Sequence, residues 1–503
     1  MSIPPPSAAN QPDQRDLLIR ASKVVTPAGI IAAEVRVRNG QITAVTELAD
    51  RTDGPVRPRS ASRPGASARL SPPDPDSGSS PDLIDLADDV VLLPGLVDTH
   101  VHINEPGRTH WEGFATATSA AAAGGVTTII DMPLNSIPPT TDIGALAAKR
   151  QAAAGRCAVD VGFWGGAVPA NIADRAELHA AGVFGFKCFT VDSGVPEFPP
   201  LGWDGVATAL RQVAELGSLL IVHAEDSARI GAAPPAAGAS YPGFLRSRPA
   251  AAEVAAVARV IELAQVTGAR VHVLHLSSAE AVPLLAAAQA GGIQVTAETC
   301  PHYLALAAEQ IGTGQTQYKC CPPIRDTANR ERLWAALADG VIGSVVSDHS
   351  PCPPELKELG TGDFGTAWGG ISSVQLGLPV MWTQASERGF GLADVARWMS
   401  SGPARLARLA AKGAIAPGHD ADLVAFAPDE RFVVEPERLL TRHRLTPYAG
   451  QELSGVVRRT WLRGAEISPD RPAGRLLTSS PVSPASASSP TGGGKHSYGR
   501  IRT

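Results

Sequence analysis

Two histidines stand two residues apart at the end of an apolar run, in the stretch VVLLPGLVDTHVH at residues 90–102. The β-branched and apolar residues before them predict a buried strand. Side chains alternate across a strand, so His100 and His102 share one face. Two imidazoles on one face can bind the same transition-metal ion.

Four further residues suited to metal or acid–base chemistry stand near the ends of later apolar runs. Imidazole together with carboxylate suits zinc and its first-row neighbours. A lysine ammonium has no acceptor and cannot bind a cation, so a lysine could take part only as the anionic carbamate formed with carbon dioxide. The four are Lys187 in GFKCF, His223 in LLIVHAED, His275 in RVHVLHLSS and Asp348 in IGSVVSDHS.

Each of these residues taken alone also has a structural explanation. A lone strand-end histidine is more often a polar rim or core residue than a ligand, and a lone lysine usually packs its stem on the surface. An aspartate before HSP, such as Asp348, is typical of a turn or helix cap. Six such residues at strand ends are poorly explained by coincidence. His272, three residues before His275, is expected on the opposite face and is interpreted as structural.

The elements that must position these residues alternate in type. Between residues 90 and 409, eight apolar runs alternate with alanine-rich stretches such as 111–125, 142–155 and 251–268. Eight strands alternating with helices over ~250 or more residues predict a (β/α)8 TIM-type barrel, whose active sites lie at the C-terminal ends of the strands. A doubly wound sheet fits less well, because no glycine-rich phosphate fingerprint opens the first helix.

The two ends of the chain predict a second, smaller domain. Short β-rich runs separated by turn sequences occupy both ends. We expect residues 16–93 and 411–467 to form one composite β-sandwich beside a barrel at 94–410. Three segments poor in large apolar side chains are expected to be disordered. They are residues 1–15, the insertion 51–81 and the tail 468–503.

Composition limits the classes of function. The 503-residue chain has a net charge of −5, with 44% hydrophobic and 18% charged residues. It has no basic block, so neither nucleic acid nor an anionic membrane is expected as a partner. No apolar run reaches the ~18 residues of a spanning helix, and the N-terminus has no apolar signal-peptide core. Six scattered cysteines without a CxxC pair predict reduced thiols and a cytoplasmic location.

A series of motifs resembles the cyclic amidohydrolase branch of the amidohydrolase superfamily. That branch includes allantoinases, dihydroorotases, hydantoinases and dihydropyrimidinases, and the motifs are most similar to those of allantoinases. The resemblance covers residues 16–50 and 82–467 and implies a barrel with a composite β-sandwich. The motifs are GLVDTHVHINEPGRTHWEGF, GGVTTIIDMPLNSIPPTTD, GFKCF, TAETCPHYLAL, KCCPPIRD, VVSDHSPCPPELK, AWGGISSVQLGLPVM and GAIAPGHDADLVAF.

The resemblance also implies a hydrolytic site with two divalent metal ions per subunit. Zinc is the first expectation, and cobalt, manganese and iron tolerate the same ligands. A bridging water would become hydroxide at neutral pH, and the aspartate would carry its proton to the departing ring nitrogen. The implied ligands are His100 and His102 for one ion, His223 and His275 for the other, carboxylated Lys187 as the bridge, and Asp348 to complete the first position.

Three residues bear on the substrate. Dihydroorotases carry an arginine two residues after the second histidine, where this chain has Asn104, so an anionic ring is disfavoured. Hydantoinases and dihydropyrimidinases carry a tyrosine soon after the lysine, and FKCFTVDSG has none. Both differences favour allantoin, opened to allantoate. Asn135 and Cys321 are further candidate contacts, although relatives often have serine or asparagine where Cys321 stands.

Two alternatives stay open. A hydantoinase or dihydropyrimidinase acting on a related ring would use the same chemistry. A non-catalytic scaffold, like the dihydropyrimidinase-related proteins, would keep the barrel and lose the metals, but all six ligand positions are present in this chain. The resemblance further implies a homotetramer with a small-molecule substrate.

Overall fold

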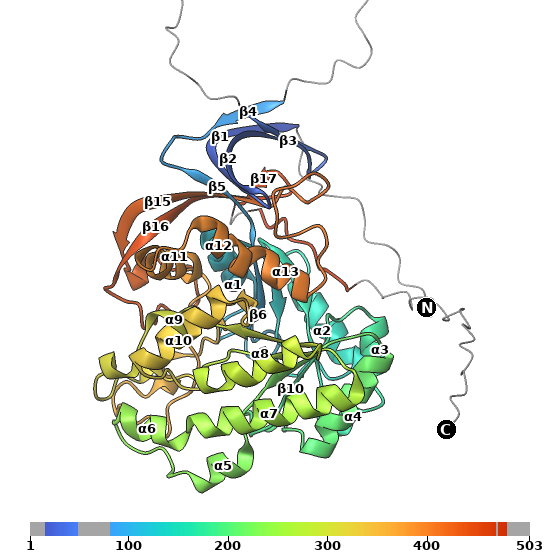
Figure 1. Cartoon of the computed structure of the whole chain (residues 1–503), viewed down its shortest axis with the longest axis vertical. Coiled ribbons are helices and arrows are strands. Elements are labelled where there is room, and N and C mark those ends of the chain that lie inside the picture. The colour runs from blue at the N-terminus through green and yellow to red at the C-terminus, as the bar shows by residue number, and fades with distance from the viewer. Residues whose placement is uncertain (1–15, 49–80, 469–470, 480–503) are drawn as a thin grey trace, which may run out of the picture.

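The computed structural model consists of a barrel of parallel strands wrapped by helices and a sheet that lies across one end of it (Figure 1). It describes residues 16–48, 81–468 and 471–479. The predicted disordered N-terminus and nearly all of the predicted 51–81 insertion lie outside these described residues.

Eight strand positions form the barrel, as predicted. Strands β6 to β8 pair in parallel, β9 to β14 do the same, and β8 and β9 follow one another in one position. A bridge between Val101 and His349 joins the last position to the first and closes the barrel. The strands are β6 Leu96–Val101, β7 Val126–Asp131, β8 Asp160–Phe163, β9 Gly165–Gly166, β10 Phe186–Phe189, β11 Leu220–His223, β12 Val271–Val273, β13 Val295–Thr299 and β14 Ser344–Val345.

Helices cover the outside of the barrel, and the predicted alanine-rich stretches contain α1, α2 and α7. The side chain of Asp142 caps α2 by accepting from Ala145 N–H at 2.8 Å. In the described residues, no helix has both the length and the hydropathy to cross a membrane. The helices are α1 Phe114–Ala123, α2 Ile143–Ala153, α3 Arg175–Ala180, α4 Trp203–Glu215, α5 Ser227–Ala232, α6 Tyr241–Ser247, α7 Ala250–Thr267, α8 Val282–Ala290, α9 Pro301–Ala305, α10 Thr327–Ala338, α11 Gly377–Glu387, α12 Leu392–Ala396 and α13 Gly402–Leu406.

Strands from both ends of the chain combine in one sheet. Its order is β17-β16-β15-β5-β1-β2-β3, and β4 pairs with β1. Strand β5 lies between β15 and β1 and leads directly into β6, so it connects this sheet to the barrel (Figure 1). Ile19, Val35, Leu92 and Trp461 belong to the sheet's own apolar core. The strands are β1 Leu17–Thr26, β2 Gly29–Arg38, β3 Gln41–Glu47, β4 Asp82–Asp85, β5 Val91–Pro94, β15 Leu423–Val433, β16 Glu452–Leu462 and β17 Ala465–Glu466.

Residues 471–479 correct the prediction of a disordered tail. The Gly474 N–H donates to the Cys157 carbonyl oxygen at 2.8 Å, and the Leu477 N–H donates to the Val161 carbonyl oxygen at 2.8 Å. The segment therefore pairs with the backbone at the start of β8. Its composition did not predict this, because backbone hydrogen bonds hold it in place together with just two large apolar side chains, Leu476 and Leu477. The remainder of the predicted tail, 480–503, lies outside the described residues.

A buried charge cluster joins the barrel to the sheet. The Nζ of Lys412 lies 2.7 Å from a carboxylate oxygen of Asp160 in β8 and 2.7 Å from one of Asp422 beside β15. Asp420 is a third partner at 2.9 Å, and Arg463 contacts Asp160 at 2.6 Å. The three aspartates are close enough to hold a metal ion. The ammonium of Lys412 already supplies the positive charge between these carboxylates, so we interpret the cluster as structural.

Replacing Lys412 with methionine should reduce the stability of the fold by about 3–5 kcal/mol, because buried carboxylates lose their main counter-charge. Chemical denaturation followed by circular dichroism measures the change. Lys23→Met, at an exposed position of β1, is the matched control and should stay within about 0.5 kcal/mol of the wild type. Equal stability of the two variants would show that the cluster does not hold the two parts together.

Candidate metal centre

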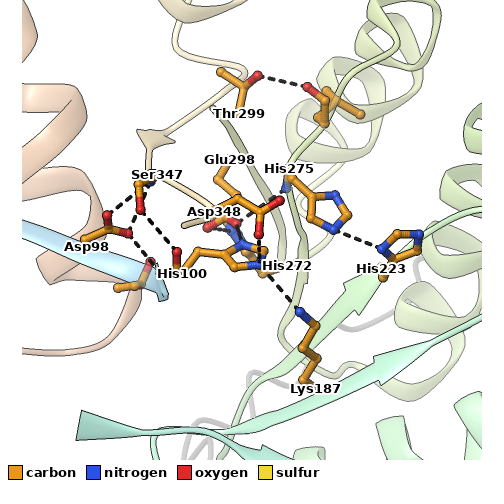
Figure 2. Close-up of polar contacts among 12 residues, drawn as sticks. Asp98, His100, Lys187, His223, His272, His275, Glu298, Thr299, Ser347 and Asp348 are labelled. Atoms are coloured by element: carbon orange, nitrogen blue, oxygen red, sulfur yellow. Dashed lines mark hydrogen bonds and ion pairs between the residues drawn. The ribbon is translucent and has the colours of Figure 1, made fainter. Parts of the chain in front are cut away.

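The structure brings the six predicted metal-site residues together, buried, at the C-terminal mouth of the barrel. The Nε2 of His100 lies 3.1 Å from Asp348 Oδ1 and 3.5 Å from Lys187 Nζ. The Nε2 of His102 lies 3.6 Å from the same Asp348 oxygen. On the other side, His223 Nδ1 lies 3.0 Å from His275 Nε2 (Figure 2). His223 and His275 are 52 residues apart in the chain, and the parallel strands β11 and β12 bring them together.

The backbone explains how the ends of β6 and β14 present their side chains. Asp98, in β6, accepts from the N–H of His100 at 3.1 Å and from the N–H of Ser347 at 3.1 Å. One carboxylate therefore fixes His100 relative to the residue that precedes Asp348. Asp348 itself has φ 44° and His275 has φ 35°, in the left-handed region that non-glycine residues rarely adopt. Such backbone is typical of functional sites.

Each histidine pair contains one ring held by a buried glutamate. The Nδ1 of His100 donates to Glu298 Oε1 at 2.6 Å, and the Nε2 of His223 donates to Glu225 Oε2 at 2.8 Å. A carboxylate can only accept, so these contacts fix the tautomer of each ring. His100 Nε2 and His223 Nδ1 consequently face the centre, where a bound metal ion would take their lone pairs. The ligand atoms of His100, His102 and Asp348 all lie within 4.8 Å of one another. This donor set fits a divalent metal ion.

Burial and neighbouring charges set the protonation states of these side chains. Burial alone would lower the pKa of His100, but the adjacent Asp348 carboxylate outweighs it and the pKa is raised. Burial lowers the pKa of His223, and it lowers the pKa of His275 well below the usual value, so both are neutral at pH 7. Burial also lowers the pKa of Lys187 to about 8, which increases the neutral amine fraction. For Asp348 burial alone would raise the pKa, but the adjacent His100 outweighs it and the pKa lies well below the usual value.

A cavity of about 470 Å³ opens onto these residues. The candidate contacts Asn135 and Cys321 line it. Asn104 does not line it, because its side chain is buried and its Nδ2 donates to the Pro351 carbonyl oxygen at 3.2 Å. The contact between Asn104 and the substrate stays a prediction that the lining of this cavity does not support.

Comparison with known proteins agrees with this geometry. The chain matches the model of the amidohydrolase family over residues 91–467. The chain belongs to the amidohydrolase family. It is 54% identical to an allantoinase of Streptomyces avermitilis over 93% of this chain and 99% of the relative. It is 49% identical to an allantoinase of Saccharomyces cerevisiae over 75% of this chain and 82% of the relative.

A solved structure places this amidohydrolase in the cyclic amidohydrolase branch. L-Hydantoinase (dihydropyrimidinase) from Arthrobacter aurescens superposes with a TM-score of 0.81 at 28% identity, covering 92% of this chain and 100% of that one. Dihydropyrimidinase from Brevibacillus agri superposes with a TM-score of 0.78 at 26% identity over 93% and 99%. The barrel with an attached β-sheet domain is thus confirmed, as is the resemblance to this branch.

Several side chains support the site without being predicted site residues, and His272, interpreted as structural, is one of them. Glu298 and Glu225 hold the rings described above, and His272 donates from Nε2 to Glu298 at 3.0 Å, so it supports the site from behind. Two buried lysines, Lys319 and Lys357, hold the cavity wall by donating to backbone carbonyl oxygens of residues 365–370. The sequence held a signal for Glu298, because a carboxylate inside a predicted buried strand must have a buried partner.

The contact between Glu298 and His100 generates a testable expectation for this metal-dependent family. Glu298→Gln should weaken zinc affinity by about 10–100-fold, since the amide no longer fixes the His100 tautomer as an anion does. Competition against a chromophoric chelator measures the affinity. Glu262→Gln, on the exposed face of α7, is the control and should bind zinc like the wild type. Unchanged affinity in Glu298→Gln would contradict the supporting role.

Proposed function

We propose that this chain hydrolyses allantoin to allantoate with two divalent metal ions. The observation that carries the proposal is one buried group of four histidines, a lysine and an aspartate, of which all but His100 line a single cavity. The high identity to allantoinases over nearly the whole chain supports allantoin as the substrate.

We assign each of the six protein ligands to one position in a two-metal centre. Zinc is the first candidate for both ions, with cobalt, manganese or iron as alternatives. When bound, the ions supply hydroxide from water at neutral pH and polarise the ring amide carbonyl. His100, His102 and Asp348 would hold one ion, and His223 and His275 the other, with carboxylated Lys187 between them.

Lys187 is suited to carboxylation. It is buried, and its Nζ lies 5.0 Å above the ring of Phe189. The lowered pKa of about 8 favours the neutral amine, whose nitrogen bonds to the carbon of carbon dioxide and releases a proton. The product is an anion long enough to reach both histidine pairs. Phe189 also stacks on His223 at 4.6 Å between ring centroids, so one aromatic ring supports both groups.

Asp348 is the candidate proton carrier. Its low pKa keeps it ionised at neutral pH, so it can accept a proton from the attacking water. Ser350 Oγ donates to Asp348 Oδ1 at 2.9 Å and restrains the carboxylate. Asp348 also lines the cavity, so it can deliver that proton to the departing ring nitrogen.

A hydantoinase or dihydropyrimidinase activity is the second candidate, since solved structures of both superpose on this chain. The cavity favours allantoin instead. Among the described residues that line it there is no tyrosine, and Phe189, Val191 and Asp192 follow Lys187 there. The domain limits, the homotetramer and the cytoplasmic location expected from the sequence stay predictions.

Protein reconstituted with zinc and bicarbonate should hold about two zinc ions per chain and open allantoin in preference to hydantoin, dihydrouracil and dihydroorotate. Metal analysis and a substrate panel on one preparation measure both properties. A bicarbonate-free preparation is the control for carboxylation of Lys187 and should be less active. Two ions with preference for another ring would change the substrate, and absence of bound metal would favour the scaffold alternative.

Lys187→Ala should lower kcat/KM for allantoin by more than about 100-fold, since loss of even an indirect support typically costs about 10–100-fold. Short carboxylic acids should restore part of the activity by occupying the place of the carbamate. The same acids added to the wild type are the control and should not increase its rate. Full activity of the variant without added acid would exclude the bridging role.

A further inference from the structure

A buried ion pair connects the cavity wall to one of the proposed metal ligands. Oε2 of Glu225 accepts from His223 Nε2 at 2.8 Å, and the same oxygen contacts Nη1 of Arg248. Glu225 is fully buried, whereas the Arg248 side chain is 19% exposed and lines the cavity. The metal ligand and the cavity wall therefore share one carboxylate oxygen.

Within the ranges that the structure describes, the glutamate that holds the other histidine pair, His100 and His102, has no contact with a residue that connects it to the cavity wall in the same way. Glu298 holds His100, and its second partner is the ring of His272, which accepts from Thr296 Oγ1 at 2.7 Å. Neither Glu298 nor His272 lines the cavity. In each histidine pair, a glutamate carboxylate therefore holds one imidazole ring. The second partner of that carboxylate differs, because it is the buried His272 for Glu298 and the cavity-lining Arg248 for Glu225.

Arg248 has donors to spare. A guanidinium carries five N–H groups, and among the described residues only Nη1 of Arg248 has an acceptor. The Oε1 atom of Glu225 is likewise buried with no partner in the described part of the chain. The carboxylate is under-satisfied, so it depends strongly on its contact with Arg248.

The pair also suits the charge of the substrate. Arg248 and Glu225 neutralise one another, so the cavity gains hydrogen-bond donors without the free positive charge that would select an anionic ring. The carbonyl oxygens of a cyclic ureide are acceptors for such donors. An arginine that the sequence did not single out stands in the cavity, while Asn104 stands outside it.

We propose that Arg248 contacts the cyclic ureide directly and, through Glu225, is a positioning residue for His223. The inference rests on the proposed two-metal hydrolysis of allantoin. Because one guanidinium serves both tasks, substrate binding and metal retention at the His223–His275 position are linked, and such linkage is reciprocal.

The test compares Arg248→Met, Arg248→Lys and the control Arg325→Met in zinc-loaded enzyme. Arg325 is matched because its Nη2 makes a buried contact of 2.5 Å with Glu253, and it does not line the cavity. It contacts Arg248 only at the backbone carbonyl oxygen, so the control also measures any loss of that backbone support. The rate of zinc loss to a chelator and the separate kcat and KM for allantoin are measured for each.

Arg248→Met should lose one of its two zinc ions about 10–100-fold faster than the wild type and keep the other. Its KM for allantoin should rise by about tenfold or more, from loss of a charge-assisted hydrogen bond. Excess zinc should restore kcat but leave KM raised. Arg248→Lys should recover zinc retention but not KM, because one ammonium cannot replace the planar fork. Arg325→Met should change neither.

Zinc loss in Arg248→Met at the wild-type rate, or equal to that in Arg325→Met, would overturn the positioning role. An unchanged KM would overturn the substrate contact. If Arg248→Met does not fold, Arg248→Lys decides, because retained zinc with a raised KM supports the proposal and an unchanged KM contradicts it. Wild-type enzyme that holds two zinc ions but does not open allantoin would contradict the proposed function, while the zinc measurements would still decide the positioning role.

Discussion

The geometry of the site depends on the hydrogen bonds that Asp98 makes across the closure of the barrel. Its carboxylate accepts from the backbone of His100 in β6 and of Ser347 after β14, residues 247 positions apart. Burial raises the pKa of Asp98 to about 6, so both N–H donors are needed to stabilise the anion. A barrel closed this way brings His100 and Asp348 to the same mouth. Because the strands between them pair in parallel, their C-terminal ends lie at that mouth too.

Burial imposes a second constraint, because every polar group at the mouth must have a partner or a ligand. His100 and His223 meet it through glutamates, whereas His275 Nδ1 has no partner among the described residues. Its Nε2 faces His223 Nδ1 at 3.0 Å, so the two rings turn ring nitrogens toward the same centre. The lowered pKa of the lysine between them has the same origin, since desolvation disfavours its charge. The chemistry of the site is thus a consequence of removing ionisable groups from water.

The expected substrate contacts differ in where the structure places their side chains. Asn135 and Cys321 line the cavity, but Asn104 turns its amide toward Pro351 even though it lies two residues after His102. The expectation for Asn104 came from its place in the family motif, and a motif position does not report which way the side chain turns. Residues 471–479 were expected to be disordered, and they pair with β8 through backbone groups that composition does not report.

The sequence by itself determined the eight strands, the two-residue spacing of His100 and His102, and the polar residues at the ends of four later strands, because strand period and burial are local properties. Only the tertiary structure decided which residues support them. Glu298 meets His100 across 198 positions, and Arg248 reaches Glu225 from the N-terminal end of α7. Contacts of this kind leave no periodic pattern in the sequence, because they depend on which side chains lie close together in the folded structure.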